Sequence, residues 1–184
     1  MFTRRHVFKL IAFWAGFLIL HYAYDFFPIL PLKLISGVDE SFFQHAKIGF
    51  FGYALVNLGE YLIRRRGLKD VAGFVYTRLF TTTVLPWFIF LIWFTAPAYY
   101  GPIASVAVEI IFANVALVLA TNAILIVEET MAGIAYPRPF KVLVGVLFLV
   151  SISLFVIFTF GPPWCDVFAD PYGGGGQLLS ITGA

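Results

Sequence analysis

Six ionisable side chains fall within or beside strongly apolar stretches of this sequence, and these are the residues best suited to chemistry. They are His21, Asp25, Glu40, His45, Lys47 and Glu109. A charge inside a membrane costs free energy, so each such residue needs a partner or a function. Two imidazoles with nearby carboxylates are typical of a divalent zinc, iron or manganese site, where an open coordination position could activate water. The sequence therefore predicts one polar site that these residues share.

Three of the six residues are expected at the same depth. His21 lies about six residues before the end of its apolar segment, whereas His45 and Glu109 each lie about six residues after the start of theirs. At 1.5 Å per residue, all three would lie roughly 9 Å below one surface. We therefore take these three as the candidate metal ligands. Asp25 or Glu40 would then serve as a general base.

Two other interpretations of these residues stay open. Two histidines at one depth on neighbouring helices could be the axial ligands of haem b, although the sequence has neither a His-Glu-x-x-His motif nor a paired-histidine motif. The residues could instead form a structural network in which Lys47 or protonated His45 pairs with Glu109 and the other carboxylates cap helix ends. Buried polar groups in a helix bundle are usually satisfied in this way.

Membrane-spanning helices are the elements expected to position these residues. Of the 184 residues, 61% are hydrophobic and 12% are charged, against about 25% charged in globular proteins. This composition excludes a soluble enzyme, a nucleic-acid binder, a disordered chain and a disulfide scaffold. A bilayer requires about 20 apolar residues per helix. We predict an all-α bundle of five transmembrane helices within residues 1–163, followed by an outer tail at 164–184. The predicted spans are residues 8–27, 39–63, 71–95, 103–127 and 140–160.

Basic residues predict the orientation of the bundle. They gather at the start of the chain, after the second span and before the fifth: Arg4, Arg5, Lys9, Arg64, Arg65, Arg66, Lys69, Arg138 and Lys141. The positive-inside rule then places the N-terminus in the cytoplasm and the C-terminus outside. We expect Arg64, Arg65, Arg66 and Lys69 to contact anionic lipid headgroups. Glu60 is interpreted as an exposed partner of Arg64, and His6 as a solvated residue.

Small residues predict which helices pack together. Two stripes at helical spacing each begin with an ionisable residue: His45, Gly49, Gly52, Val56 and Gly59 in the second span, and Glu109, Ala113, Ala116, Ala120 and Ala123 in the fourth. Such faces allow helix backbones to approach closely. We therefore expect the second and fourth spans to pack against each other and to bring His45 and Glu109 together.

Several motifs in the chain resemble those of one protein family. They are His21-x-x-Tyr24-Asp25, the stretch from Asp39 to Lys47, Glu60-Tyr61, Pro162-Pro163 and the stretch from Phe168 to Pro171. Together they resemble a family of small prokaryotic five-helix membrane proteins known as a domain of unknown function. The resemblance implies a place in the cytoplasmic membrane of a prokaryote. It also implies that the outer tail folds back over the helix ends, with Asp166 or Asp170 above the polar site.

This sequence departs from the family pattern at three positions. Asp39 replaces an asparagine, Phe43 a tryptophan and Gln44 a glutamate. The change at Gln44 removes one potential metal ligand. The resemblance otherwise groups His21, Asp25, Glu40, His45, Lys47, Glu60 and Asp170 as one recurring set.

The size of the chain, its small-residue helix faces and its aromatic surface favour a supporting function. We expect an accessory or scaffolding subunit of a larger membrane complex, with membrane lipids and other membrane subunits as partners and no nucleic acid. One alternative is an outer-leaflet, metal-dependent membrane enzyme of a hydrolase-like kind. The other is a haem-binding membrane subunit.

Overall fold

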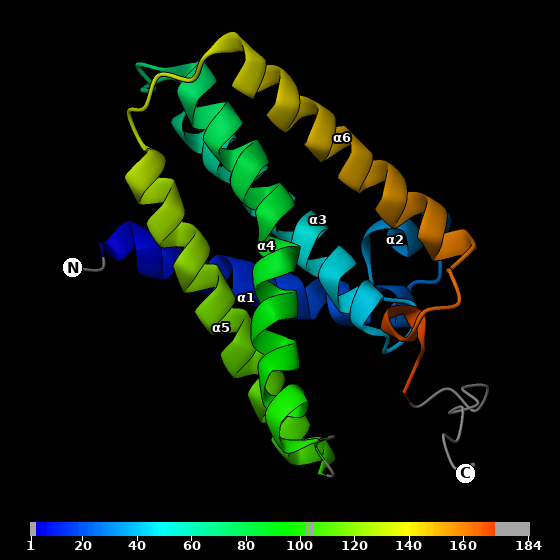
Figure 1. The fold of residues 1–184 in the computed structure, drawn as a ribbon. Helices are drawn as coiled ribbons and strands as arrows, with labels where there is room; N and C mark the ends of the chain where they lie inside the picture. The colour runs from blue at the N-terminus through cyan, green and yellow to red at the C-terminus, as the bar shows by residue number, and fades with distance from the viewer. Residues whose placement is uncertain (1–2, 102, 104, 172–184) are drawn as a thin grey trace.

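The computed structural model describes residues 3–101, 103 and 105–171, and these residues form helices and connecting loops without any β-strand. The predicted all-α fold class is confirmed (Figure 1). The elements are α1 (Arg4–Phe26), α2 (Leu30–Ile35), α3 (Phe42–Arg64), α4 (Val71–Tyr100), α5 (Val106–Met131), α6 (Arg138–Phe160) and a short 3-10 helix, η1 (Asp166–Phe168). The glycine run at 173–176 lies outside the described residues.

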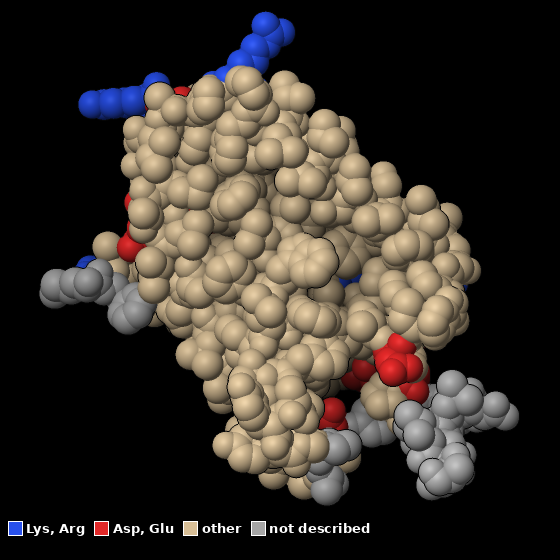
Figure 2. All heavy atoms as spheres, viewed as in Figure 1, with Lys and Arg blue, Asp and Glu red and all other residues tan. Residues whose placement is uncertain are grey.

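Among the described helices, α1, α4, α5 and α6 are long and apolar enough to cross a membrane. With 23 residues, α3 is roughly 34 Å long, but Gln44, Lys47 and Asn57 lower its hydropathy. Figure 2 shows a broad face made almost entirely of uncharged side chains, with Lys and Arg projecting from one end and acidic side chains at the opposite end. These features indicate a multi-pass membrane helix bundle.

The polar side chains of α3 are buried against neighbouring helices. It packs against both α1 and α4, and the Phe50 ring lies 5.3 Å from that of Phe148 and 5.2 Å from that of Phe155 on α6. Gln44, Lys47 and Asn57 are accordingly buried. Protein neighbours can pair such polar groups, whereas lipid tails cannot. These three polar side chains of α3 therefore lie where other helices cover them.

Four helices form a ring around the main hydrophobic core. The pairs in contact are α1 with α3, α3 with α4, α4 with α5, and α5 with α1. In Figure 1, α4 and α5 run side by side as a long hairpin. Inside the ring lies a buried cluster made of Phe13, Tyr53, Leu85, Ile89, Leu117, Ala120 and Ile124.

The expected packing of the two small-residue stripes is wrong. Over their described lengths, α3 and α5 do not pack closely at the backbone, because they lie diagonally across the ring. Gly49 and Gly52 of α3 face large side chains instead. A Cβ atom added at Gly52 would lie 3.5 Å from the Phe13 ring of α1, and one at Gly49 would lie 2.9 Å from Ile89 of α4. These glycines make room for side chains of α1 and α4.

The chain after α6 folds back onto the bundle, as the resemblance implied. The Phe168 ring of η1 lies 4.6 Å from the Phe43 ring of α3 and 5.4 Å from the Phe158 ring of α6. This contact covers the first turn of α3, the part of the helix that carries His45.

Candidate functional site

Two histidines from different helices lie side by side at one end of the bundle. His21 is near the end of α1 and His45 is in the first turns of α3, and their ring centroids are 5.1 Å apart. The helices run antiparallel, because Phe13 faces Tyr53 and Lys9 faces Glu60. Antiparallel packing brings the end of α1 to the start of α3, so the histidines meet at the common depth expected from the sequence.

Glu40 completes this group from the loop that precedes α3. One of its carboxylate oxygens lies 3.5 Å from Nε2 of His21, and the other lies 3.6 Å from Nε2 of His45. Among the described residues, these three form the group whose ligand atoms all lie within 4.8 Å of one another. Two ligand atoms bound at about 2.1 Å to one tetrahedral metal lie about 3.4 Å apart. The distances from Glu40 to the two histidines are close to this value, and the three ligand atoms, all within 4.8 Å of one another, would draw together around one divalent ion. We call His21, Glu40 and His45 the outer cluster, after the side of the membrane predicted from the sequence.

A hydrogen bond orients the ring of His45. Its Nδ1 lies 2.9 Å from the backbone carbonyl oxygen of Ser41. Because a carbonyl oxygen only accepts, Nδ1 donates this bond, and Nε2 is the ring nitrogen that faces Glu40. Metal-bound histidines are usually oriented by such a bond from their second nitrogen. His21 Nδ1 is buried and has no hydrogen-bond partner among the described atoms.

The turn that carries Glu40 is held by its neighbours. Asp39 accepts a 2.8 Å hydrogen bond from the backbone N–H of Ser41, and Ser41 caps α3 by accepting from the N–H of Gln44. The Glu40 side chain is 46% exposed, whereas those of His21 and His45 are 15% and 24% exposed. The outer cluster is therefore buried on its histidine side and open on its carboxylate side.

Glu109 is a candidate ligand that the structure does not bring into this group. Within the described chain, the metal-ligating group contains Glu40 in its place. The reason is the diagonal arrangement of α3 and α5, which removes the direct packing that would have joined Glu109 to His45. Asp25 lies one turn beyond His21 on α1 and is exposed, which leaves it available as a base at the edge of the site.

Lys47 also lies apart from the outer cluster. It is fully buried, and its ammonium donates to the backbone oxygen of Lys33 and to the hydroxyl of Thr159, each over 3.0 Å. These bonds join α3 to α2 and α6. The expected pairing of Lys47 with Glu109 is replaced by this structural contact.

The haem interpretation fits this geometry poorly. In a bis-histidine haem the macrocycle lies between the two imidazoles. Here the Glu40 carboxylate lies within 3.5 Å and 3.6 Å of both Nε2 atoms, and the imidazole rings are 5.1 Å apart. That space accommodates an ion and not a porphyrin.

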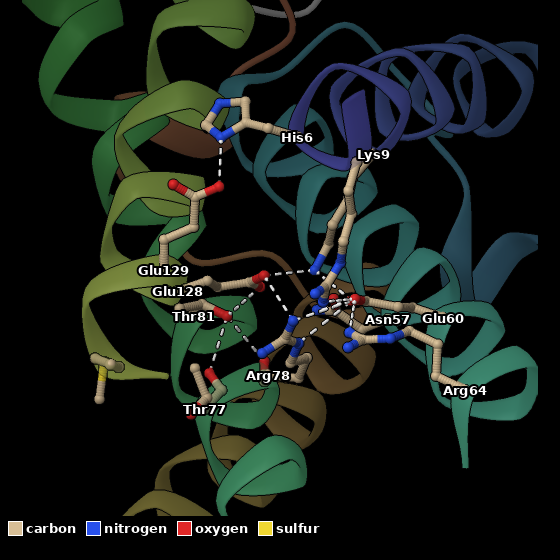
Figure 3. Close-up of polar contacts among 12 residues, drawn as sticks. His6, Lys9, Asn57, Glu60, Arg64, Thr77, Arg78, Thr81, Glu128 and Glu129 are labelled. Carbon is tan, nitrogen blue, oxygen red and sulfur yellow. Dashed lines mark hydrogen bonds and ion pairs between the residues drawn. The ribbon is translucent and has the colours of Figure 1, made fainter. Parts of the chain in front are cut away.

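A second cluster of charged residues, which was not predicted from the sequence, lies at the opposite end of α1 (Figure 3). Its centre is Glu60, which accepts from Lys9 at 2.9 Å, from Arg64 at 2.9 Å, from Arg78 at 3.2 Å and from Arg5. The Glu60 side chain is 12% exposed, so the interpretation of Glu60 as an exposed partner of Arg64 alone is wrong.

A second carboxylate in this inner cluster comes from α5. The Glu128 side chain is 4% exposed. It accepts from Lys9 at 2.6 Å, from the Tyr53 hydroxyl at 2.7 Å and from Thr81 at 2.9 Å. Lys9 therefore bridges the two carboxylates, as Figure 3 shows. Buried charges are tolerated when they are paired and hydrogen-bonded in this way. We call Arg5, Lys9, Glu60, Arg64, Arg78 and Glu128 the inner cluster, again after the side of the membrane predicted from the sequence.

His6 belongs to the same end of the bundle and is buried, contrary to the expected solvated position. Its ring nitrogens lie 3.3 Å from Glu129 and 3.1 Å from Asn122.

The sequence did contain a signal for the inner cluster. Arg78 lies seven residues inside a predicted span, and a charged residue at such a position requires a partner. The remaining basic residues of the loop after α3, Arg65, Arg66 and Lys69, are exposed.

Aromatic rings separate the two clusters. Phe17 stacks at 6.4 Å on both His21 and His45. On its other side, Phe17 contacts Phe13 at 6.2 Å, and Phe13 contacts Tyr53 at 5.2 Å. Phe13 and Phe17 therefore lie between the outer cluster and the inner cluster.

The structure defines a multi-pass membrane bundle with a polar cluster at each end. No family model, curated protein or solved structure matches the chain. The resemblance to a prokaryotic family therefore stays a prediction, and the function is inferred from the clusters themselves.

Proposed function

We propose that this chain is a five-span protein of a prokaryotic cytoplasmic membrane that binds a divalent metal ion at His21, Glu40 and His45 and uses it for hydrolysis at the outer surface. The observation that carries the proposal is the placement of one carboxylate 3.5 Å and 3.6 Å from the two Nε2 atoms. The Ser41 carbonyl supports it by holding His45 in the tautomer that a metal requires.

The donor set fits a catalytic site better than a purely structural one. Catalytic zinc sites commonly have three protein ligands and one open position, whereas structural sites have four protein ligands. A bound ion would supply an activated water and would polarise an oxygen of the substrate. Asp25, which is exposed one turn beyond His21, could accept a proton at the rim. Glu40 would bind the ion rather than act as the base.

The proposed fifth span is α3. Its antiparallel contacts with α4 are shown by the pairing of Asn57 with Thr82 at 3.0 Å and by that of Glu60 with Arg78. Since α3 is antiparallel to both α1 and α4, it returns the chain from the end of α1 to the start of α4. The basic residues at that second end support a cytoplasmic location by the positive-inside rule.

Elemental analysis tests the metal site directly. The purified chain is stripped with chelator, incubated separately with zinc, iron(II) and manganese, and desalted. We expect about one equivalent of one of these metals, with loss of binding in His21→Ala and His45→Ala. Glu109→Gln is the matched control and should bind as the wild type does. Less than about a tenth of an equivalent of every metal would overturn the proposal.

A second candidate function is the accessory subunit of a larger complex, and α6 favours it. In the most apolar 18-residue stretch of α6, 11% is buried inside the protein. The helix therefore presents a long apolar face to a partner helix or to lipid. Extraction in a mild detergent followed by size measurement tests this candidate. A complex with other membrane proteins would support it, whereas a stable lone monomer would contradict it.

A further inference from the structure

A mainly apolar groove runs between α1 and α3 beside the inner cluster. Its volume is about 330 Å³, and Phe8 and Ala12 of α1 line it together with Val56, Gly59 and Ile63 of α3. A Cβ atom added at Gly59 would meet no other atom within 4 Å. The missing side chain at this position therefore keeps the groove open.

The groove faces away from the protein interior. Phe8 is 72% exposed and Ile63 is 82% exposed, so in a membrane these side chains would contact lipid tails. The seven residue steps from Val56 to Ile63 correspond to about 10 Å along the axis of α3. A groove of this length and character matches part of an acyl chain.

The groove also has a cationic end. Arg5, Lys9 and Arg64 line it together with one carboxylate, Glu60. Lys9 has a second counterion in Glu128. Arg5 and Arg64 both pair with Glu60, and Arg78 lies between Glu60 at 3.2 Å and Glu128 at 3.4 Å. Four cations of the inner cluster thus share two carboxylates, which leaves an excess of positive charge.

The two arginines at the groove retain the capacity to bind a further anion. The side chains of Arg5 and Arg64 are 49% and 38% exposed. Each guanidinium has five N–H donors, and its planar fork matches a phosphate group. Glu60 occupies part of this capacity and leaves the remaining donors for an anion.

We propose that the groove binds one anionic phospholipid, with its phosphate against Arg5 and Arg64 and part of an acyl chain along Val56, Gly59 and Ile63. The apolar floor and the cationic end complement the two halves of such a lipid. This site differs from a general attraction of the basic loop to headgroups, because it predicts a single retained molecule. It is independent of the proposed metal site at the other end of α1.

Native mass spectrometry of the full chain in a neutral detergent tests the proposal. Dioleoyl phosphatidylglycerol and dioleoyl phosphatidylcholine are added separately, and the affinity for each is measured. We expect one phosphatidylglycerol to bind in preference to phosphatidylcholine. Gly59→Leu should abolish this binding by filling the groove. Gly145→Leu is the matched control, because Gly145 on α6 also faces open space.

Charge variants test the phosphate contact. Arg5→Gln and Arg64→Gln should each weaken phosphatidylglycerol binding about fivefold. Arg65→Gln and Arg66→Gln remove the same charge from exposed positions in the adjacent loop and should change the affinity less than twofold, as expected for a general surface field. A melting curve of each variant confirms that it is folded. If Gly59→Leu does not fold, Ala12→Leu fills the groove from α1 instead.

Three outcomes would overturn the proposal. One is wild-type binding of phosphatidylglycerol by both groove-filling variants. Another is an equal loss of affinity in the loop variants and in Arg5→Gln and Arg64→Gln, which would show a general surface attraction. The third is displacement of the lipid by glycerol phosphate at equal concentration, which would show an anion site with no contribution from the acyl chain.

Discussion

Tyr53 on α3 donates its hydroxyl hydrogen to Glu128 on α5 over 2.7 Å, across the centre of a ring in which these two helices are diagonal neighbours. The same carboxylate accepts from Lys9 on α1 and Thr81 on α4. One buried carboxylate therefore links all four helices of the ring. This explains how α3 and α5 are held in register without close backbone contact.

Removal of the Glu128 charge should destabilise the bundle strongly. Glu128→Gln keeps the size of the side chain but leaves Lys9 buried with less compensation. Breaking a buried ion pair typically costs about 3 to 5 kcal/mol, so we expect the free energy of unfolding in detergent to fall by about 3 kcal/mol. Glu129→Gln is the control, since that side chain is 53% exposed, and its effect should stay within about 0.5 kcal/mol. Equal effects of the two variants would contradict the linking role of Glu128.

Asp39 should position the proposed metal ligand Glu40 without binding the metal itself. Its carboxylate accepts from the N–H of Ser41 and so fixes the turn that carries Glu40. Loss of a supporting contact of this kind typically lowers metal affinity about 10- to 100-fold. We expect a loss in this range for Asp39→Ala in a competition titration against a metal chelator. Asp39→Asn retains an acceptor oxygen and should bind within about threefold of the wild type. If Asp39→Ala binds as tightly as the wild type, the turn has no positioning role.

Gly49 and Gly59 of α3 lie in different surroundings and should respond differently to the same substitution. At Gly49, a Cβ atom would lie 2.9 Å from Ile89, whereas at Gly59 it would meet open space. Overpacking a core typically costs about 1 to 3 kcal/mol. We therefore expect Gly49→Leu to lower the free energy of unfolding by about that amount and Gly59→Leu to change it by less than about 0.5 kcal/mol. Thermal unfolding in detergent measures both. A larger loss of stability for Gly59→Leu than for Gly49→Leu would contradict the open space observed around Gly59.

The single cysteine offers a test of the five-span topology. Cys165 is exposed, and a membrane-impermeant maleimide should label it in cells whose cytoplasmic membrane is intact. In a Cys165→Ser background, Lys33→Cys before α3 should also be labelled, whereas Lys69→Cys after α3 should react only after lysis. Labelling of Lys33→Cys and Lys69→Cys from the same side would show that α3 does not cross the membrane.

Much of this arrangement follows from the sequence. Long apolar segments with few charges predict the helices α1, α3, α4, α5 and α6, because a bilayer disfavours charges in such segments. Counting residues from the segment ends also predicts that His21 and His45 share a depth. Their meeting then requires only that α1 and α3 be antiparallel neighbours, which is common for helices joined by a short connection.

The choice of partners within the bundle could not be predicted in the same way. Helical spacing identifies the glycines of α3 as a narrow face, but it does not show that Phe13 and Ile89 occupy that face. Glu40 lies in a loop, where helical periodicity gives no direction for its side chain. Glu60 has Arg64 one turn away in the sequence, yet Arg5 and Arg78 reach it only through the packing of three helices.

The phenylalanines between the two clusters have a consequence for proton movement. Phe13 and Phe17 carry neither a lone pair nor an acidic hydrogen, so protons cannot be relayed through them from Tyr53 to the histidines. These two rings therefore form no proton relay between the clusters. If the outer cluster hydrolyses a substrate as proposed, protons released there would leave at that end of the bundle and not along these rings.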